Sequence, residues 1–214
     1  MITNKLSVLM AERKLKATRI SSDTGIARST LSGLTNESSK MIQFETINTL
    51  CNYLRITPND FLLYSPFDIE FDIQPVDVSA FCLPKSDTDD SLDGPIVGIN
   101  TFKVDIFVKI SKNGHSYDTY ELNAGLNGDY QPSNEDTSSV ELFGLPTINL
   151  DISSVGKELI SFWTEQSLYA FYSLVENRFR KVFKESAIQF LNESSRSTIF
   201  NNATFSIALP ITPF

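Results

Sequence analysis

Hydrophobic residues recur with two different spacings along the chain. Through residues 1–63 they return every three to four positions, which predicts a series of short helices. After residue 66 the spacing falls to two, as in strands that bury one face, and over residues 157–192 it returns to the helical value. We therefore expect two domains, an all-α domain in residues 1–66, which we call the head, and an α+β domain in residues 67–214, which we call the body.

Five helices and no strand are expected in the head. Their approximate bounds are residues 2–13, 17–24, 28–35, 44–54 and a last helix opened by Thr57 and Pro58. Gly25 ends the second helix, because glycine takes the left-handed conformation at no steric cost. Thr57 suits the N-cap of the last helix and Pro58 its first position. In the fourth helix, Phe44 falls on the same stripe as Ile47 and is expected to be buried.

The body is expected to hold an antiparallel sheet and a long, aromatic-rich helix. Strands are predicted at residues 69–78, 81–83, 102–110, 117–122, 140–143, 147–152 and 204–209. Asn113-Gly114 is the signal of a type I′ turn, which would join the strand at 102–110 to the next one. The helical stretch of residues 157–192 would be roughly 55 Å long as one piece, so a break is expected near residues 164–167.

An apolar stripe, rich in aromatic side chains, runs along this helical stretch. Its members are Leu168, Phe171, Tyr172, Val175, Phe179, Val182, Phe183 and Phe190. The stripe suits burial against the sheet of its own domain, and it also suits contact with a second subunit. Both interpretations stay open, and a wide stripe would serve both.

Composition places the chain among ordinary globular proteins. Of its 214 residues 41% are hydrophobic and 21% charged, which excludes a disordered or fibrous chain. No apolar run approaches the roughly 18–20 residues that span a bilayer, and residues 1–14 lack the apolar core of a signal peptide. We therefore expect a cytoplasmic protein without membrane contact. Cys51 and Cys82 are expected to be thiols, and the single histidine, His115, argues against a zinc site, so neither a metal nor a cofactor is predicted.

The net charge of -8 is unevenly distributed. The head carries eight basic and five acidic residues, a net charge of +3, whereas the body carries ten basic and twenty-one acidic residues, a net charge of -11. Such a division is expected where only the head approaches the phosphates of a nucleic acid. Chance clustering in a short segment would produce the same imbalance.

One segment of the head carries a known pattern. In residues 16–36, KATRISSDTGIARSTLSGLTN, the buried apolar positions and the turn glycine follow a fixed spacing, at Ile20, Gly25, Ile26, Leu31 and Leu34. This pattern resembles the helix-turn-helix of the lambda-repressor and Cro-like family, also called XRE-type, and the likeness extends over residues 1–63. The resemblance implies that residues 28–35 form a recognition helix that lies in the major groove of DNA. Ala17, Ser21 and Ala27 depart from the family's usual residues, and Ala27 lacks the side-chain oxygen of an N-cap.

The resemblance also implies which side chains meet DNA. The exposed face of the recognition helix would carry Arg28, Ser29, Ser32 and Asn36, with Thr30 and Thr35 beside them, and phosphate contacts would come from Lys16, Arg19 and Lys40. For Arg28, a forked contact to guanine, a phosphate contact and a solvated surface position all stay open. Ser29 and Ser32 suit a specific contact, or they are small residues that let the helix approach closely.

Catalytic and metal-binding motifs fail on spacing. Ser91 stands in a sequence similar to the nucleophile motif of LexA-type autopeptidases, but no lysine lies at the required distance, and Ala124-Gly125 follows the serine instead of preceding it. The acidic loop of residues 86–94 lacks the closing glutamate of an EF-hand. His115 has no histidine or suitably placed cysteine as a partner. We therefore expect a protein that is not an enzyme.

These expectations combine into a function. The resemblance implies a sequence-specific DNA-binding transcriptional regulator, and we expect a repressor of the phage or mobile-element type that binds a double-stranded operator as a homodimer. The body would provide the dimer contact and receive a protein or small-molecule effector. The alternative is a protein-binding inhibitor or antitoxin, in which the acidic body mimics nucleic acid and the head regulates its own operon.

Overall fold

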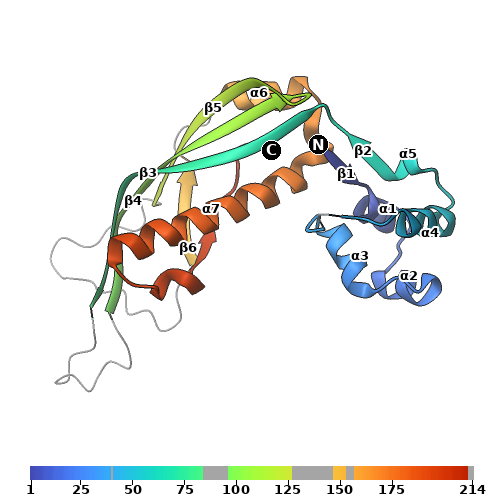
Figure 1. Cartoon of the computed structure of the whole chain (residues 1–214), viewed down its shortest axis with the longest axis horizontal. Helices are drawn as coiled ribbons and strands as arrows, with labels where there is room; N and C mark the ends of the chain where they lie inside the picture. The colour runs from blue at the N-terminus through green and yellow to red at the C-terminus, as the bar shows by residue number, and fades with distance from the viewer. Residues whose placement is uncertain (40, 84–95, 127–146, 153–156, 212–214) are drawn as a thin grey trace, which may run out of the picture.

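Helices make up most of the head in the computed structural model, which describes residues 1–39, 41–83, 96–126, 147–152 and 157–211 (Figure 1). The helices of seven residues or more in the described head are α1 (Leu6–Glu12), α2 (Ala17–Thr24), α3 (Arg28–Thr35) and α4 (Phe44–Leu54). The expected fifth helix, α5 (Pro58–Phe61), is a single turn, so the head has fewer full helices than the five predicted. Thr57 caps this turn, and Asp60 completes a capping box with it.

The start of the chain is a strand, which corrects the prediction of an all-helical head. β1 (Ile2–Asn4) pairs with β2 (Leu62–Tyr64) in an antiparallel ladder, and α1 begins only at Leu6. Non-local contacts hold β1 extended. The buried amino group of Met1 donates hydrogen bonds of 2.7 Å to the carbonyls of Ser65 and Phe67. It also lies 3.1 Å from the carboxylate of Asp68.

Phe44 is exposed, so the prediction that it joins the buried stripe of α4 is wrong. Its exposed fraction is 90%, whereas Ile47 and Leu50 one turn or more further along α4 are buried. Phe44 is the first residue of the helix, and no described element reaches past this first turn to cover its ring. The periodicity identified the buried face of α4 correctly, but the first residue on that face lies beyond the edge of the hydrophobic core of the head.

Two glycines in the head should respond to alanine in opposite directions. Gly25 has φ of 77°, the left-handed region, and a Cβ added there would meet no atom within 4 Å. Gly25→Ala is therefore expected to destabilise the head by about 1 kcal/mol through backbone strain alone. Gly33 lies within α3, where an added Cβ would make an ordinary contact of 3.6 Å with the Cβ of Ser39. Gly33→Ala is expected to stabilise the head by about 0.5–1 kcal/mol. Urea unfolding followed by circular dichroism measures both, and equal shifts of the same sign would contradict the conformations assigned to the two residues.

The body contains a five-stranded sheet. Its strands, in spatial order, are β3 (Phe67–Leu83), β4 (Ile96–Lys112), β5 (His115–Leu126), β6 (Thr147–Ile152) and β7 (Thr204–Ser206). The antiparallel sheet predicted for the body is confirmed for the pairs β3–β4, β4–β5 and β5–β6. The last pair, β6 and β7, runs parallel, which the sequence did not predict. The strands predicted at 69–78 and 81–83 form one strand with register shifts after Pro75 and Ser79. The strand predicted at 140–143 lies outside the described residues.

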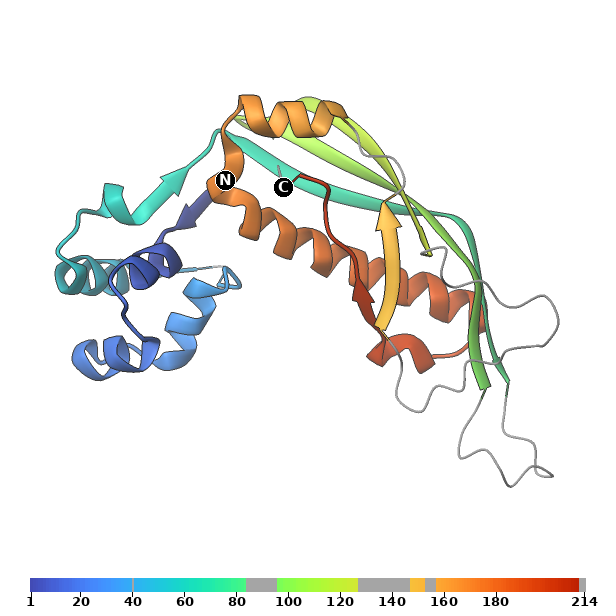
Figure 2. The same cartoon turned by 180° about the vertical axis from the view of Figure 1, so that it is seen from behind.

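Turn and helix-break predictions in the body are confirmed. Asn113 and Gly114 join β4 to β5 with φ of 52° and 81°, the two positive values of a type I′ turn. The helical stretch is divided at the expected place into α6 (Lys157–Glu165), a short 3-10 segment η1 (Leu168–Phe171) and α7 (Tyr172–Ser195). A further 3-10 segment, η2 (Ile199–Asn202), follows α7. Figures 1 and 2 show α7 lying lengthwise along one face of the long strands.

The aromatic stripe is buried against the sheet of its own chain. Phe179 and Phe183 are 0% exposed, and their rings lie 5.3 Å from Phe71 and 6.3 Å from Phe102, respectively, between ring centres. The half-buried members of the stripe, Tyr172, Val182 and Phe190, pack against the same core. The first interpretation of the stripe is therefore confirmed, and its buried members are not available as a subunit interface.

Buried hydrophobic side chains form two separate clusters. One lies among the helices of the head and includes Leu6, Ile20, Leu31, Leu50 and Phe61. The other lies between the sheet and the helices of the body, and it also includes Met1 from the start of the chain. In the described residues, no helix is both long enough and apolar enough to cross a membrane.

Candidate nucleic-acid interface

Helices α2 and α3 are held together by a short, well-bonded turn. Ile20 on α2 and Leu31 on α3 are fully buried in the head core. Between the helices, the hydroxyl of Thr24 donates to the carbonyl of Ile20 at 2.6 Å and accepts from the backbone N–H of Ile26 at 3.3 Å. Gly25 takes the left-handed conformation at the C-cap of α2. The two helices and the turn between them therefore have the arrangement expected of a helix-turn-helix. The buried side of α3 is packed in the head core, which leaves its other side exposed.

The outer face of α3 presents polar side chains to solvent. Arg28, Ser29, Thr30 and Ser32 are exposed, and Thr35 is half-buried. Ala27, the N-cap residue, makes no side-chain hydrogen bond to the helix, as its methyl group requires. The first N–H groups of α3 are therefore not capped by that side chain, and a helix N-terminus in this state favours an anionic partner such as phosphate.

The end of α3 uses some of its polar groups internally. The Thr35 hydroxyl donates to the carbonyl of Ser32 at 3.1 Å, and the Asn36 amide donates to the Ser32 hydroxyl at 3.3 Å. Asn36 is exposed, and its backbone carbonyl accepts a hydrogen bond of 3.1 Å from the amide of Asn177 on α7. Sequence reasoning did not find Asn177, because nothing in the local pattern links α7 to α3.

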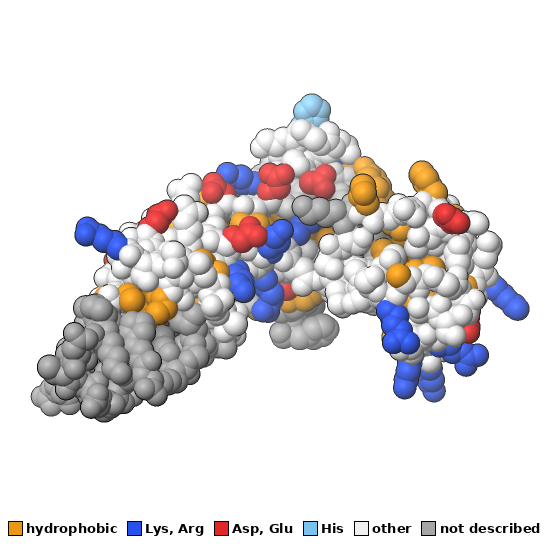
Figure 3. All heavy atoms as spheres, turned by 60° about the horizontal axis from the view of Figure 1, so that its bottom comes forward, with side chains coloured by type: hydrophobic (Ala, Val, Ile, Leu, Met, Phe, Trp, Pro, Cys, Tyr) orange, Lys and Arg blue, Asp and Glu red, His pale blue; other side chains and the backbone are white. Residues whose placement is uncertain are grey.

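The expected phosphate-binding residues differ in their surroundings. Lys16 is exposed at the N-cap of α2. Arg19 is exposed, and its Nε lies 3.4 Å from a carboxylate oxygen of Asp23, which also accepts from the Tyr53 hydroxyl at 2.8 Å. Arg19 would have to exchange this weak ion pair for a phosphate. Lys40 lies outside the described residues. Figure 3 shows Lys and Arg side chains projecting together from one edge of the head, with fewer acidic side chains among them.

Comparison with known proteins identifies the head. The family model of the Cro/C1-type helix-turn-helix DNA-binding domain matches residues 5–66. An uncharacterised HTH-type transcriptional regulator, YozG of Bacillus subtilis, is 36% identical over 59 residues, which cover 28% of this chain and 70% of that protein. The chain belongs to the Cro/C1-type helix-turn-helix family. A crystal structure of a candidate DNA-binding protein from Bacteroides fragilis aligns at 17% identity and a TM-score of 0.28, covering 29% of this chain and 100% of that one.

Membership of the Cro/C1-type family makes the head a DNA-binding domain of the kind that transcriptional regulators carry. The match of the family model ends at residue 66, so the role of the body has to be argued from its own residues. Two features were compared with those of LexA-type autopeptidases. Ser91 lies outside the described residues, and the Ala124-Gly125 bond lies within β5, where Ala124 is buried.

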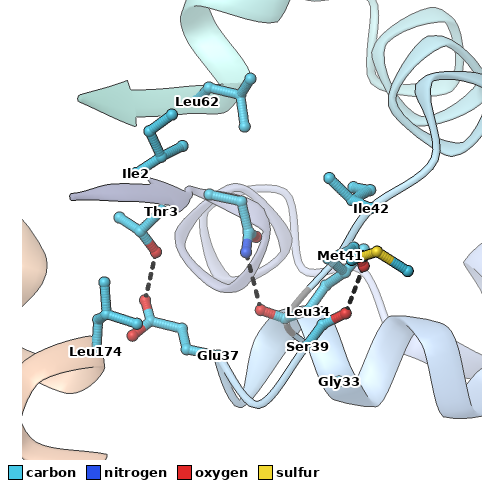
Figure 4. Close-up of a pocket in the computed structure, with 11 residues that line it drawn as sticks. Ile2, Thr3, Gly33, Leu34, Glu37, Ser39, Met41, Ile42, Leu62 and Leu174 are labelled. Atoms are coloured by element: carbon cyan, nitrogen blue, oxygen red, sulfur yellow. Dashed lines mark hydrogen bonds between the residues drawn. The ribbon is translucent and has the colours of Figure 1, made fainter. Parts of the chain in front are cut away.

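A cavity of about 200 Å³ lies where the Cro/C1-type head meets the body (Figure 4). Its lining includes Leu34 of α3, Glu37 just after the end of α3, and Leu174 from α7. The Thr3 hydroxyl donates to one carboxylate oxygen of Glu37 at 3.0 Å, and the amide of Asn4 donates to the carbonyl of Leu34 at 3.1 Å. The end of α3 and the residues just after it are therefore bonded to β1 and, through the hydrogen bond between Asn177 and Asn36, to the first part of α7.

Glu37 is poorly solvated in this junction. Its second carboxylate oxygen, Oε2, is buried and has no hydrogen-bond partner among the described residues. Desolvation raises the pKa of Glu37 above the ordinary value of a glutamate side chain, although the hydrogen bond from Thr3 and the positive charge of Arg178 oppose this shift. Because the folded state holds the proton more tightly than the unfolded state, this carboxyl reduces stability as the pH rises above about 4.5.

Glu37→Gln is therefore expected to gain stability relative to the natural chain as the pH rises from 4 to 7. The amide oxygen of glutamine can still accept from Thr3, and the desolvated charge is absent. Thermal unfolding of both proteins across this range measures the difference, with Glu121→Gln, an exposed carboxyl on β5, as the matched control. A difference that stays constant with pH would show that Glu37 titrates alike in the folded and unfolded chain.

Proposed function

We propose that this chain is a sequence-specific repressor of the phage or mobile-element type that acts by occluding a promoter. The observation that carries the proposal is the exposed polar face of α3, which follows an uncapped helix start and is held by a buried inner face. In the proposed complex, α3 lies in the major groove with Arg28, Ser29, Thr30, Ser32, Thr35 and Asn36 toward the bases, and Lys16, Arg19 and Lys40 bind phosphates.

The proposal includes a division into two domains, residues 1–66 and 67–214. The two separate hydrophobic clusters support this division, although Met1 belongs to the cluster of the body. A single helix-turn-helix makes few contacts, so we also propose a homodimer that reads two half-sites about 34 Å apart. Because the aromatic stripe is buried within one chain, the dimer would use a different surface of the body.

Selection of bound DNA from a random pool by the purified full chain tests the proposal. We expect one enriched motif arranged as two symmetric half-sites with a fixed spacing. Enrichment of a single, asymmetric half-site would contradict the dimer. No enrichment above that of a control protein without a DNA-binding domain would contradict sequence-specific DNA binding itself.

A second candidate is a protein-binding inhibitor or antitoxin whose head regulates its own operon. The net charge of -11 on the body favours it, because an acidic surface suits a basic partner that normally binds nucleic acid. Light scattering of the full chain measures its oligomeric state, in which the two candidate functions differ. A monomer at tens of micromolar would weaken the dimeric repressor and favour this alternative.

A further inference from the structure

One short segment of the acidic body is strongly basic. Residues 178–184 contain four basic and no acidic residues, whereas the rest of the body contains six basic and twenty-one acidic residues. The segment lies within α7. This segment has a charge of +4, whereas the body as a whole has a net charge of -11. We therefore ask which groups its basic side chains contact.

The basic side chains divide into one that stabilises the body and three that face solvent. Arg180 binds Glu176 at 2.7 Å between Nε and Oε1, and the buried Glu176 also accepts from the backbone N–H of Leu209 at 3.1 Å, so this arginine serves the fold. The other three are Arg178, Lys181 and Lys184, which are all exposed.

These three residues form a row on the outer face of α7. They are spaced by three positions, so they share one side of the helix, and Phe179 and Phe183 on the opposite side are buried against the sheet. Lys181 has a side chain that is 65% exposed, and its ion pair with Glu185 is long, at 3.9 Å between Nζ and Oε1. The guanidinium of Arg178 and the ammonium groups of Lys181 and Lys184 are therefore accessible to an anionic partner.

The row begins beside the recognition helix. Asn177, which precedes Arg178, donates the hydrogen bond to the carbonyl of Asn36 at the end of α3. Figures 1 and 2 both show α7 leading away from this contact along the body. In Figure 3, Lys and Arg side chains also gather on the part of the body next to the head. The C-terminal end of α3 and the start of the basic row are thus neighbours, although they belong to the head and the body respectively.

We propose that Arg178, Lys181 and Lys184 on the outer face of α7 form a second DNA-binding surface that contacts backbone phosphates flanking the half-site read by α3. This inference rests on the proposed function of the head. The row extends for about 9 Å along the helix axis, enough for two or three phosphates of one strand. Without it, the acidic body would be repelled by any duplex bound to α3, and the row neutralises this repulsion at the place nearest to α3.

The test compares two double variants of the full chain on the DNA site selected from the random pool, carried on a duplex with ten flanking base pairs on each side. The variant Lys181→Gln/Lys184→Gln removes two charges from the row. The control variant Lys103→Gln/Lys157→Gln removes two charges from exposed lysines on β4 and α6. All four side chains are exposed, so thermal unfolding is expected to match that of the natural chain.

For the row variant, we expect the slope of log affinity against log salt concentration to fall in magnitude by about 2, and that of the control to change by less than half as much. Between 50 and 200 mM salt, the ratio of natural to variant affinity should then shrink by about tenfold. On a duplex without flanking base pairs the difference between natural chain and row variant should disappear.

Two results would overturn the inference. If the natural chain binds the selected site and both double variants show the same slope, the row does not contact DNA, while the proposed function of the head stands. If the natural chain enriches no DNA at all, the proposed function fails and the row loses its partner.

Discussion

Replacing Phe179 with alanine is expected to lower the free energy of unfolding of the body by about 3–5 kcal/mol. Phe179 lies in the first half of α7 and is 0% exposed, and its ring lies 5.3 Å from that of Phe71 on β3 and 5.7 Å from that of Phe183. Truncation removes both ring contacts and leaves a cavity between helix and sheet, which the long strands cannot easily close. Urea unfolding followed by the fluorescence of the single tryptophan, Trp163, reports on this core, because Trp163 is buried in it.

Tyr169→Ala provides the matched control for Phe179→Ala. Tyr169 belongs to η1, immediately before α7, and is 44% exposed, so its truncation is expected to cost less than about 1 kcal/mol. A different outcome would matter for function. If Phe179→Ala left the unfolding free energy unchanged and instead dissociated an oligomer, the stripe would be a subunit interface and its assignment to the core of one chain would be wrong.

Elements determined by local signals could be predicted from the sequence. The bounds of α2, α3 and α4 coincide with the predicted ranges, because each carries buried apolar residues that fit a helical period, and α2 also has a distinct end at Gly25. The turn at Asn113-Gly114 was predictable for the same reason, since its positive φ values depend on two adjacent residues. These features need no knowledge of the rest of the chain.

Elements determined by distant partners could not be predicted in this way. β1 exists because β2 and the backbone carbonyls of Ser65 and Phe67 bind the start of the chain, and no periodicity within residues 2–13 indicates that pairing. The parallel pairing of β6 with β7 likewise joins segments far apart in the chain. Phe44 shows the opposite error. It lies on the helical face that the periodicity predicts to be buried, but the core of the head does not extend far enough to cover its ring.

The candidate site shows the same division. The polar face of α3 could be predicted because the resemblance assigns it position by position, from Arg28 to Asn36. The contact of Asn36 with Asn177 joins residues 141 positions apart, so it could only come from the structure. Averaging the charge over the whole body also concealed the basic row on α7, which has significance only because of where α7 begins.

Arg28→Ala is expected to weaken binding to the selected site by about 1–3 kcal/mol and to relax the preference at one base pair of each half-site. Arg28 is the first residue of α3 and is exposed, and no hydrogen bond or ion pair from another described residue engages its guanidinium. The N-terminal part of a recognition helix lies closest to the base edges, and a guanidinium can donate two hydrogen bonds to O6 and N7 of guanine. Repeating the random-pool selection with the variant measures both the loss of affinity and the position that becomes degenerate.

Arg28→Lys separates base recognition from phosphate binding at this position. Lysine retains the charge but lacks the planar fork, so a bidentate contact to guanine should be lost in this variant almost as fully as in Arg28→Ala. A phosphate contact, in contrast, should survive the change to lysine, and the loss in Arg28→Ala would then be uniform across all DNA sequences and would diminish with added salt. If both variants bind the selected site as tightly as the natural chain, Arg28 is a solvated surface residue, and base recognition by α3 must depend on its hydroxyl and amide side chains.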